Sequence, residues 1–409
     1  MRPVYISGLG QTDVGEHWQV SLRELAHYAA QPAVEEAGGA PPEALFVGNM
    51  LAGQLSRQQH LGALIADFCG WRGIEAATIE AAGASGGAAL RQGFLAVASG
   101  MVESALVVGV EKMTDKIGAG VNAALATAAD SDYEGAQGVT PAALAALLMR
   151  RYMHEYGVAL NDFAGFSVNA HANAKTNPRA MYRNTLTIDA YLRASMVAEP
   201  VNMFDAAPDA DGAAAIVLTA NLPRESDRPL IRIAGSSAAT DSLAVHDRRA
   251  PLVLSAAALS ARKAWAMAGI GPDDVGVFEL HDSFSILAVL SLEACGFAER
   301  GLACSLSAMP DAAISRSGRI PICAFGGLKA RGNPGGASGV YQAVEVALQL
   351  RGEAGANQVG GFRSDNGRER GSEVEGKGVG RRVEAAWGMA QSLGGLGATA
   401  VTHVLAREA

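Results

Sequence analysis

One stretch constrains the fold more than any other: residues 78–90, TIEAAGASGGAAL, in which a short β-type run meets a turn rich in glycine and alanine that opens onto a helix. A strand that turns this sharply into a helix exposes one side chain beside the helix N-terminus. Backbone N–H groups and the helix dipole at that place stabilise a thiolate or an oxyanion. Gly83 occupies the exposed position. The turn therefore suits a nucleophile but carries no nucleophilic side chain.

The rest of the chain alternates strand-like and helix-like segments, which predicts an α/β fold with open sheets. Helices are expected at residues 21–36, 59–69 and 85–98. Strands are expected at residues 4–8, 44–48, 78–82, 105–111, 214–219, 231–235, 275–280, 320–324 and 399–405.

A weak internal repeat predicts how these segments are organised. Residues 34–49, VEEAGGAPPEALFVGN, parallel residues 265–280, WAMAGIGPDDVGVFEL, and this wide offset indicates duplication of a whole half. A chain of 409 residues accommodates two such halves. We expect an N-terminal half from residues 1–111 and 211–229, an inserted region at 112–210, and a C-terminal half at 230–409.

Two regions interrupt this α/β pattern. In the inserted region, Tyr152, His154 and His171 are interpreted as lying on solvated helix faces. Residues 352–382 are rich in glycine and hold six basic and four acidic residues from position 363 onward, with almost no apolar periodicity. This pattern favours an exposed surface insertion, either a solvated loop or an arm that docks a partner.

Composition excludes several classes of function. The net charge is −8 and the basic residues are dispersed, so nucleic-acid binding is not expected. The four cysteines have neither zinc-ligand spacing nor the density of a secreted scaffold, which indicates free thiols and no metal site. The N-terminal residues do not resemble a signal peptide, and no run of 18 apolar residues follows. A soluble, cytoplasmic protein without membrane association is expected.

Three further stretches carry a family resemblance together with residues 80–90. The sequence resembles the thiolase superfamily, specifically thiolases of the sterol-carrier-protein type, whose corresponding turn reads like EAACASGGAAL. The resemblance implies two duplicated α/β halves in five αβαβα layers, with an inserted loop domain that covers coenzyme A. The further stretches are GNMLAGQLSRQQHLGALIAD at 48–67, ELHDSF at 279–284 and GGLKARGNPGGASGVYQ at 326–342.

The same resemblance implies where an active site lies. Thiolases carry a Cys at the position of Gly83, often a Cys at Ser283, and a His at Asn333, whereas His281 is kept. An amide can donate a hydrogen bond but cannot take up a proton at neutral pH, so Asn333 retains an oxyanion role and loses a base role. Gly394, in SLGGLG, corresponds to a glycine-rich loop whose backbone N–H lines an oxyanion hole.

Alternatives remain for two of the polar residues near this site. Ser283 is either a site residue or the N-cap of the helix that follows. Cys323 ends an expected strand beside the same cleft, and it is interpreted as a buried structural cysteine rather than as a replacement nucleophile.

The resemblance implies a protein that binds an acyl-CoA and acts on the carbon–carbon bond of a 3-ketoacyl-CoA or 3-hydroxyacyl-CoA, within the acyl-CoA C-acyltransferase family. Thiolysis requires the missing nucleophile, whereas a retro-aldol reaction needs only an oxyanion hole and one acid/base group. His281, Asn333 and Ser283 would suffice for that reaction. The alternative is a non-catalytic pseudo-thiolase that serves as a binding or assembly subunit.

An engineered Cys-to-Gly substitution would explain Gly83 but would leave Asn333 unexplained. The coenzyme A thioester is expected as substrate, and no tightly bound cofactor is expected. The implied protein partners are a second copy, packed near residues 78–82, and an OB-fold, zinc-ribbon subunit of the kind that joins similar thiolases.

Overall fold

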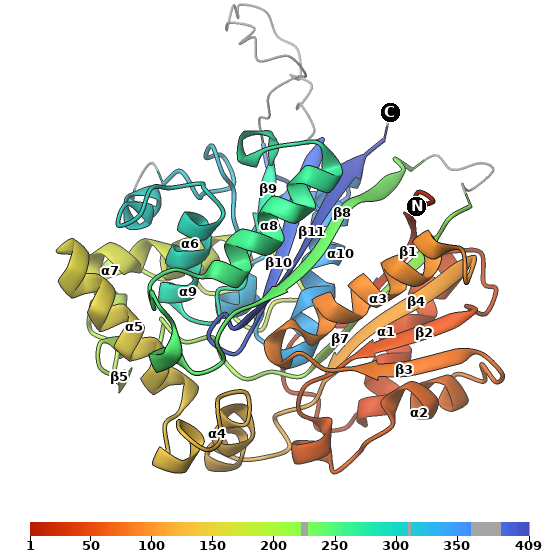
Figure 1. Ribbon diagram of the computed structural model, residues 1–409, viewed down its shortest axis with the longest axis horizontal. Helices are drawn as coiled ribbons and strands as arrows, with labels where there is room; N and C mark the ends of the chain where they lie inside the picture. Colours follow the sequence, from red (N-terminus) through yellow and green to blue (C-terminus); the bar gives the residue numbers. More distant parts are fainter. Residues whose placement is uncertain (222–227, 310–311, 361–385, 409) are drawn as a thin grey trace, which may run out of the picture.

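The computed structural model describes residues 1–221, 228–309, 312–360 and 386–408, which form a mixed α/β protein (Figure 1). The helices are α1 (Leu22–Glu36), α2 (Leu61–Phe68), α3 (Ser85–Ser99), α4 (Gly118–Ala126), α5 (Pro141–Tyr156), α6 (Ala164–Ala174), α7 (Ile188–Leu192), α8 (Ser255–Ala268), α9 (Ser285–Ala294) and α10 (Ser338–Arg351). The strands are β1 (Tyr5–Gln11), β2 (Ala44–Gly48), β3 (Glu75–Ile79), β4 (Ser104–Glu111), β5 (Met196–Ala198), β6 (Val201–Asn202), β7 (Gly212–Thr219), β8 (Ile231–Thr240), β9 (Val277–Glu279), β10 (Trp387–Gly394) and β11 (Thr399–Arg407).

Nine of these strands form one sheet in the order β3-β2-β4-β7-β1-β8-β11-β10-β9. The seam between β1 and β8 is narrow, because only Tyr5 with Arg232 and Ile6 with Ile231 pair across it. The outer edge of the N-terminal half-sheet has two parallel pairs, β3 with β2 and β2 with β4, and the outer edge of the C-terminal half-sheet has one, β10 with β9. The pairs nearer the seam are antiparallel in both half-sheets. The sheet is therefore two half-sheets of similar construction.

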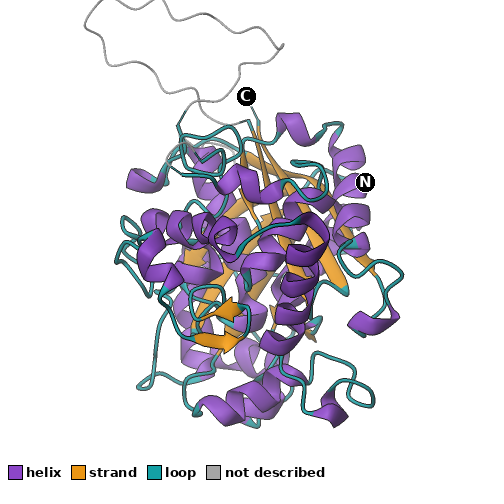
Figure 2. Cartoon of the chain, turned by 90° about the vertical axis from the view of Figure 1, so that its left-hand side faces the viewer, coloured by secondary structure: helices purple, strands orange, loops and turns teal. Residues whose placement is uncertain are grey.

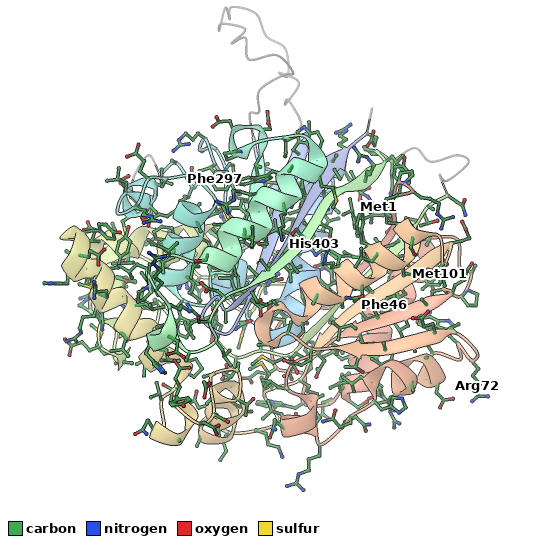
Figure 3. All side chains as sticks on the ribbon, in the orientation of Figure 1. Met1, Phe46, Arg72, Met101, Phe297 and His403 are labelled. Carbon is green, nitrogen blue, oxygen red and sulfur yellow. The ribbon has the colours of Figure 1, made fainter. Side chains whose placement is uncertain are left out.

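Helices complete five layers around the half-sheets. One outer layer contains α1, which packs on β1 and β7, and α2, which packs on β3. The other outer layer contains α8, which packs on β8 and β11, and α9, which packs against α8. Between the half-sheets lie α3, which contacts β2, β4 and β11, and α10, which contacts β10 and β7. Phe46 on β2 and His403 on β11 are buried within these layers, whereas Met101 lies at the periphery (Figure 3).

Glycines allow the two central helices to approach each other closely. A Cβ atom at Gly86 would lie 2.7 Å from the carbonyl oxygen of Gly336, and one at Gly339 would lie 2.3 Å from the backbone nitrogen of Gly87. Real Cβ atoms do not approach backbone so closely. The glycines in both motifs thus bring the N-terminal ends of α3 and α10 together at the centre of the molecule.

Several expected elements differ in the structure. The strand expected at 78–82 already ends at Ile79, and the one expected at 320–324 is reduced to a single bridge between Phe278 and Ile322. A left-handed backbone at Cys323, with φ of 48°, prevents the chain from continuing as a strand there. Strand β10 was not expected, because the glycines at both ends of WGMAQSLG are unfavourable for a strand.

Residues 112–210 contain α4 to α7 and the small sheet of β5 and β6, which face the viewer in Figure 2. His154 is exposed, as expected for a solvated helix face. The same expectation is wrong for Tyr152 and His171, which are buried. The Tyr152 hydroxyl donates a 2.5 Å hydrogen bond to Glu293, so tertiary packing against α9 overrides the polar pattern of the segment.

The expected exposed insertion at 352–382 falls mostly on residues 361–385, outside the described part of the chain. Within residues 352–360 the expectation holds for the exposed residues 352, 353, 355 and 356. It is wrong for Val359, which is buried, and for Asn357, which donates 2.8 Å hydrogen bonds to the carbonyl oxygens of Asn173 and Ala324. Among the described residues, no helix is long and apolar enough to cross a membrane.

Glu111, at the end of β4, fixes three backbone segments at the centre of the fold. Its fully buried carboxylate accepts hydrogen bonds from the backbone nitrogens of Met50, Leu51 and Gly336, at 2.9, 3.1 and 3.0 Å, and from Asn49 Nδ2 at 2.8 Å. Burial raises the pKa of this carboxyl to about 7, although the same hydrogen bonds favour its charged form. Because its hydrogen-bond donors come from both halves of the chain, the buried Glu111 carboxylate links the two halves.

We predict that Glu111→Ala lowers the free energy of unfolding by about 3–5 kcal/mol, because it leaves several buried donors without an acceptor. Urea unfolding followed by circular dichroism measures the change. Glu75→Ala, on the exposed edge strand β3, is the control and should change stability by less than about 0.5 kcal/mol. A loss below about 1 kcal/mol in Glu111→Ala would contradict this role.

Candidate active site

A cavity of about 100 Å³ is lined by Gly83, His281, Ser283 and Asn333, which come from three distant parts of the sequence. The structure therefore brings together four of the five predicted site residues. The fifth, Gly394, is the buried last residue of β10 rather than part of a loop, and its neighbour Gly395 lines the cavity instead. The rest of the wall is mostly apolar and includes Leu125, Leu144, Leu243, Val245, Phe284, Leu393 and Leu396.

The turn around Gly83 is crowded. A Cβ atom at residue 83 would lie 2.7 Å from the Leu393 carbonyl oxygen and 3.4 Å from His281 Nε2. Ser85, two residues later, is buried: its hydroxyl donates a 2.6 Å hydrogen bond to the Ala82 carbonyl and accepts one of 2.9 Å from the Ala81 nitrogen. Position 83 thus faces His281, and a side chain there would require the Leu393 backbone to shift. Ser85 holds the turn rather than serving as a nucleophile.

His281 follows β9 and is only 4% exposed. Burial, together with the positive charge of Arg331, lowers the pKa of its imidazole to about 3. His281 Nδ1 has no hydrogen-bond partner among the described residues. At neutral pH the ring is therefore uncharged, and it can exchange hydrogen bonds with a ligand but is a very weak base.

Asn333 lies in the loop that leads into α10. Its backbone N–H donates to the Pro208 carbonyl at 3.2 Å, and its Oδ1 accepts a 3.0 Å hydrogen bond from the Ser338 hydroxyl. Because Oδ1 is engaged, the amide Nδ2 is the group that remains to donate hydrogen bonds to a bound molecule. Such a donor suits an oxyanion and cannot act as a base.

Ser283 lines the cavity beside His281. The alternative interpretation as a helix N-cap is wrong, because α9 begins at Ser285 with Phe284 in the capping position. The Ser283 carbonyl accepts a 2.8 Å hydrogen bond from the Ala207 nitrogen. This contact fixes the backbone and leaves the hydroxyl beside the cavity.

Cys323 is buried away from the cavity lining. Its thiol contacts the Leu280 carbonyl at 3.8 Å, and burial, together with the nearby Asp282 and Glu279 carboxyls, raises its pKa well above the usual value. A thiol that resists ionisation is a poor nucleophile, so the structure supports the structural interpretation of this cysteine.

Two carboxylates in the lining were not predicted as site residues: Glu134 and Asp209. Glu134 is buried and accepts hydrogen bonds from the backbone nitrogens of Val245 and Asp130, at 2.8 and 3.2 Å, so it holds a loop in place. Asp209 is partly buried, and its backbone forms a parallel bridge with Asn333. Burial raises the pKa of the Asp209 carboxyl to about 6. The acidic segment DAAPDADG, which contains Asp209, was the only sequence feature that could have indicated a carboxylate at this site.

Family models match both halves of the chain: "Thiolase, N-terminal domain" matches residues 4–221 and "Thiolase C-terminal domain-like" matches residues 237–366. The chain belongs to the thiolase superfamily. The predicted family and five-layered fold are thereby confirmed. Among the residues described in this thiolase-superfamily chain, no group of three or more His, Cys, Asp or Glu side chains could hold a metal ion.

Relatives of this thiolase-superfamily protein include transferases and lyases. An acetyl-CoA acetyltransferase of Methanothermobacter thermautotrophicus is 41% identical over the full length of both chains. A 17-hydroxy-3-oxo-4-pregnene-20-carboxyl-CoA lyase of Mycobacterium tuberculosis is 30% identical over 87% of this chain and 93% of its own. The solved structure of an Ltp2-ChsH2(DUF35) aldolase superimposes with a TM-score of 0.80 at 22% identity, covering 99% of this chain and 98% of that one, and so shares the fold.

We predict that Asp209→Asn stabilises the protein near neutral pH. Because the folded-state pKa is raised, the folded protein binds more protons than the unfolded one between about pH 4 and pH 6, and native stability falls as pH rises through that window. The variant has no carboxyl group to ionise at this position. Its free energy of unfolding should therefore exceed that of the native protein by about 1–2 kcal/mol above pH 6, and the difference should vanish below about pH 4. Urea unfolding at pH 4 and pH 7.5 measures it.

Asp189→Asn is the matched control, because this exposed aspartate forms a surface ion pair with Arg193. Its stability difference from the native protein should stay within about 0.5 kcal/mol at both pH values. An Asp209→Asn variant less stable than the native protein at pH 7.5 would show that the carboxylate makes a stabilising contact.

Proposed function

We propose that this chain binds a coenzyme A thioester and cleaves, or in reverse forms, the carbon–carbon bond beside the thioester of a 3-hydroxyacyl-CoA without a covalent acyl-enzyme. The observation that carries the proposal is a cavity that gathers polar groups around position 83, where there is no nucleophilic side chain and where a Cβ atom would lie 2.7 Å from the Leu393 carbonyl oxygen. The named relatives act on CoA thioesters as transferases and lyases, which supports the substrate class.

The residues of the cavity suit retro-aldol chemistry better than thiolysis. In a retro-aldol reaction the 3-hydroxyl loses its proton, the C2–C3 bond breaks, and the electron pair moves into an enolate of the thioester. Hydrogen-bond donors stabilise that enolate oxygen. The Asn333 amide, the neutral His281 ring and the Ser283 hydroxyl supply donors. Cleavage of a 3-ketoacyl-CoA would instead require a nucleophile to attack the ketone.

We extend the proposal to the surroundings of the site. The N-terminal half would comprise residues 1–111 and 211–229, and the C-terminal half residues 230–409. The segment at 112–210 would form a loop domain that covers the bound coenzyme A. A homodimer would pack along the exposed edge strand β3. An OB-fold, zinc-ribbon partner is implied by the family resemblance, and the similar Ltp2-ChsH2(DUF35) aldolase, whose name joins a DUF35 component to Ltp2, supports a partner subunit.

A second candidate is a non-catalytic pseudo-thiolase that serves as a binding or assembly subunit. It is favoured by the departures at Gly83, Ser283 and Asn333 from the residues that the family resemblance implies. Both candidates would bind coenzyme A, which calorimetry measures. Only the enzymatic candidate would convert a thioester, so turnover separates the two.

We predict that the native protein shows no thiolysis of acetoacetyl-CoA above background, and that Gly83→Cys alone restores little. The Leu393 carbonyl must shift to admit the new Cβ, and Asn333 cannot deprotonate the new thiol. Gly83→Cys combined with Asn333→His should be much more active than either single variant, because nucleophile and base act as a unit. Spectrophotometric loss of acetoacetyl-CoA in the presence of free coenzyme A measures the rates.

Gly83→Ala is the control for crowding, because it adds the Cβ atom without a thiol. It should match Gly83→Cys in stability and show no thiolysis. Robust thiolysis by the native chain would defeat the proposal. Full recovery by Gly83→Cys alone would mean that His281 is a sufficient base.

A further inference from the structure

The segment that closes one side of the cavity carries three aspartates: Asp205, Asp209 and Asp211. Two of them have structural roles. Asp205 accepts hydrogen bonds from the Tyr191 hydroxyl at 2.7 Å and from the Asn202 nitrogen at 3.0 Å. Asp211 accepts hydrogen bonds from the backbone nitrogens of Met113 and Thr114, at 2.6 and 2.9 Å. The chain thus uses two of the three carboxylates to fix the segment.

Asp209 differs from its two neighbours. Its carboxylate makes no hydrogen bond or ion pair with any described residue, and it lines the cavity. The backbone bridge to Asn333, which includes the hydrogen bond from the Asn333 nitrogen to the Pro208 carbonyl, places Asp209 beside the residue that the resemblance assigns to an oxyanion role. An unengaged carboxylate therefore lies next to the amide donor.

The other titratable or polar groups in the lining are poorly suited to accept a proton. His281 is held neutral and weakly basic by burial and by Arg331. Both Glu134 oxygens accept backbone hydrogen bonds. The Asn333 amide and the Ser283 hydroxyl are not bases at neutral pH. Among the described residues of the lining, Asp209 is the carboxylate that remains available for proton transfer.

We propose that Asp209 is the catalytic proton-transfer residue of this site, an assignment that rests on the retro-aldol function proposed above. Its carboxylate takes the proton of the substrate's 3-hydroxyl. The C2–C3 bond then breaks, so that a carbonyl compound leaves and the electron pair remains on the thioester as an enolate. The protonated Asp209 returns the same proton to C2, which yields the shortened acyl-CoA and restores the carboxylate. No oxidant, reductant or further reactant is needed.

The surroundings of Asp209 match this task. Its partial burial raises the pKa of the carboxyl to about 6, near the pH at which a base must both accept and return a proton. The 3-hydroxyl oxygen and C2 are both bonded to the same carbon of the substrate, so one carboxylate can reach both. Asn333, beside it, would donate to the enolate oxygen as the bond breaks.

The test uses acetyl-CoA in D₂O, because proton exchange at C2 requires the base and the oxyanion donors but no second substrate. Mass spectrometry of the acetyl group follows deuterium uptake. The native protein should catalyse exchange, and Asp209→Asn should slow it by about 100-fold or more while it still binds acetyl-CoA by calorimetry. The control Asp273→Asn changes the net charge equally at an exposed position outside residues 112–210 and should exchange at the native rate.

Asp209→Ala provides a second, independent readout. Formate should accelerate exchange by this variant, because it can enter the vacated space and supply a carboxylate, and it should not accelerate Asp209→Asn, where the amide fills that space. A purely structural role would show no such difference. This comparison remains informative even if one of the variants is less stable than the native protein.

The outcomes separate the two levels of the proposal. Native-rate exchange by Asp209→Asn, or equal effects of formate on the Asn and Ala variants, would overturn the assignment of Asp209 and leave the retro-aldol function standing. A native protein that binds acetyl-CoA but catalyses neither exchange nor cleavage of any 3-hydroxyacyl-CoA would overturn the proposed function and, with it, the assignment.

Discussion

The buried carboxylate of Glu111 is the contact on which the arrangement of this site most depends. It joins the backbone at Met50 and Leu51, from the N-terminal half, to Gly336, from the C-terminal half. Met50 and Gly335 both line the cavity, so the carboxylate fixes two of its walls at once. The close approach of α3 and α10, which their glycines permit, places position 83 within the same framework. The site exists because the two halves are held in register.

Within that framework, a glycine at position 83 limits what chemistry is available. Gly83 provides no nucleophile, and a Cβ atom at this position would lie only 2.7 Å from the Leu393 carbonyl oxygen. The neighbouring imidazole of His281 is kept neutral by burial, and Asn333 offers an amide donor instead of a base. In the proposed reaction the donors of the cavity would stabilise an oxyanion, and the unengaged carboxylate of Asp209 would supply acid/base chemistry. Together they favour a reaction that proceeds through an enolate over one that proceeds through an acyl-enzyme.

Much of this could be predicted from sequence because the motifs around Gly83, His281 and Asn333 are long and specific. Their assembly in one cavity followed from the duplicated fold. Other features depended on contacts between distant residues. The burial of Tyr152 requires α9, and the loss of the strand at 320–324 follows from the backbone at Cys323. Asp209 was missed because the sequence does not reveal which of three nearby aspartates lacks partners.

The absence of a covalent intermediate is the central claim, and a single-turnover experiment tests it most directly. Native protein is mixed with an equal amount of a 3-hydroxyacyl-CoA, without free coenzyme A, and is quenched with acid. Mass spectrometry then measures the intact protein and the small products. Retro-aldol cleavage predicts a carbonyl compound and a shortened acyl-CoA with unchanged protein mass, because no thiol co-substrate is consumed. Protein heavier by the mass of an acyl group would contradict the account.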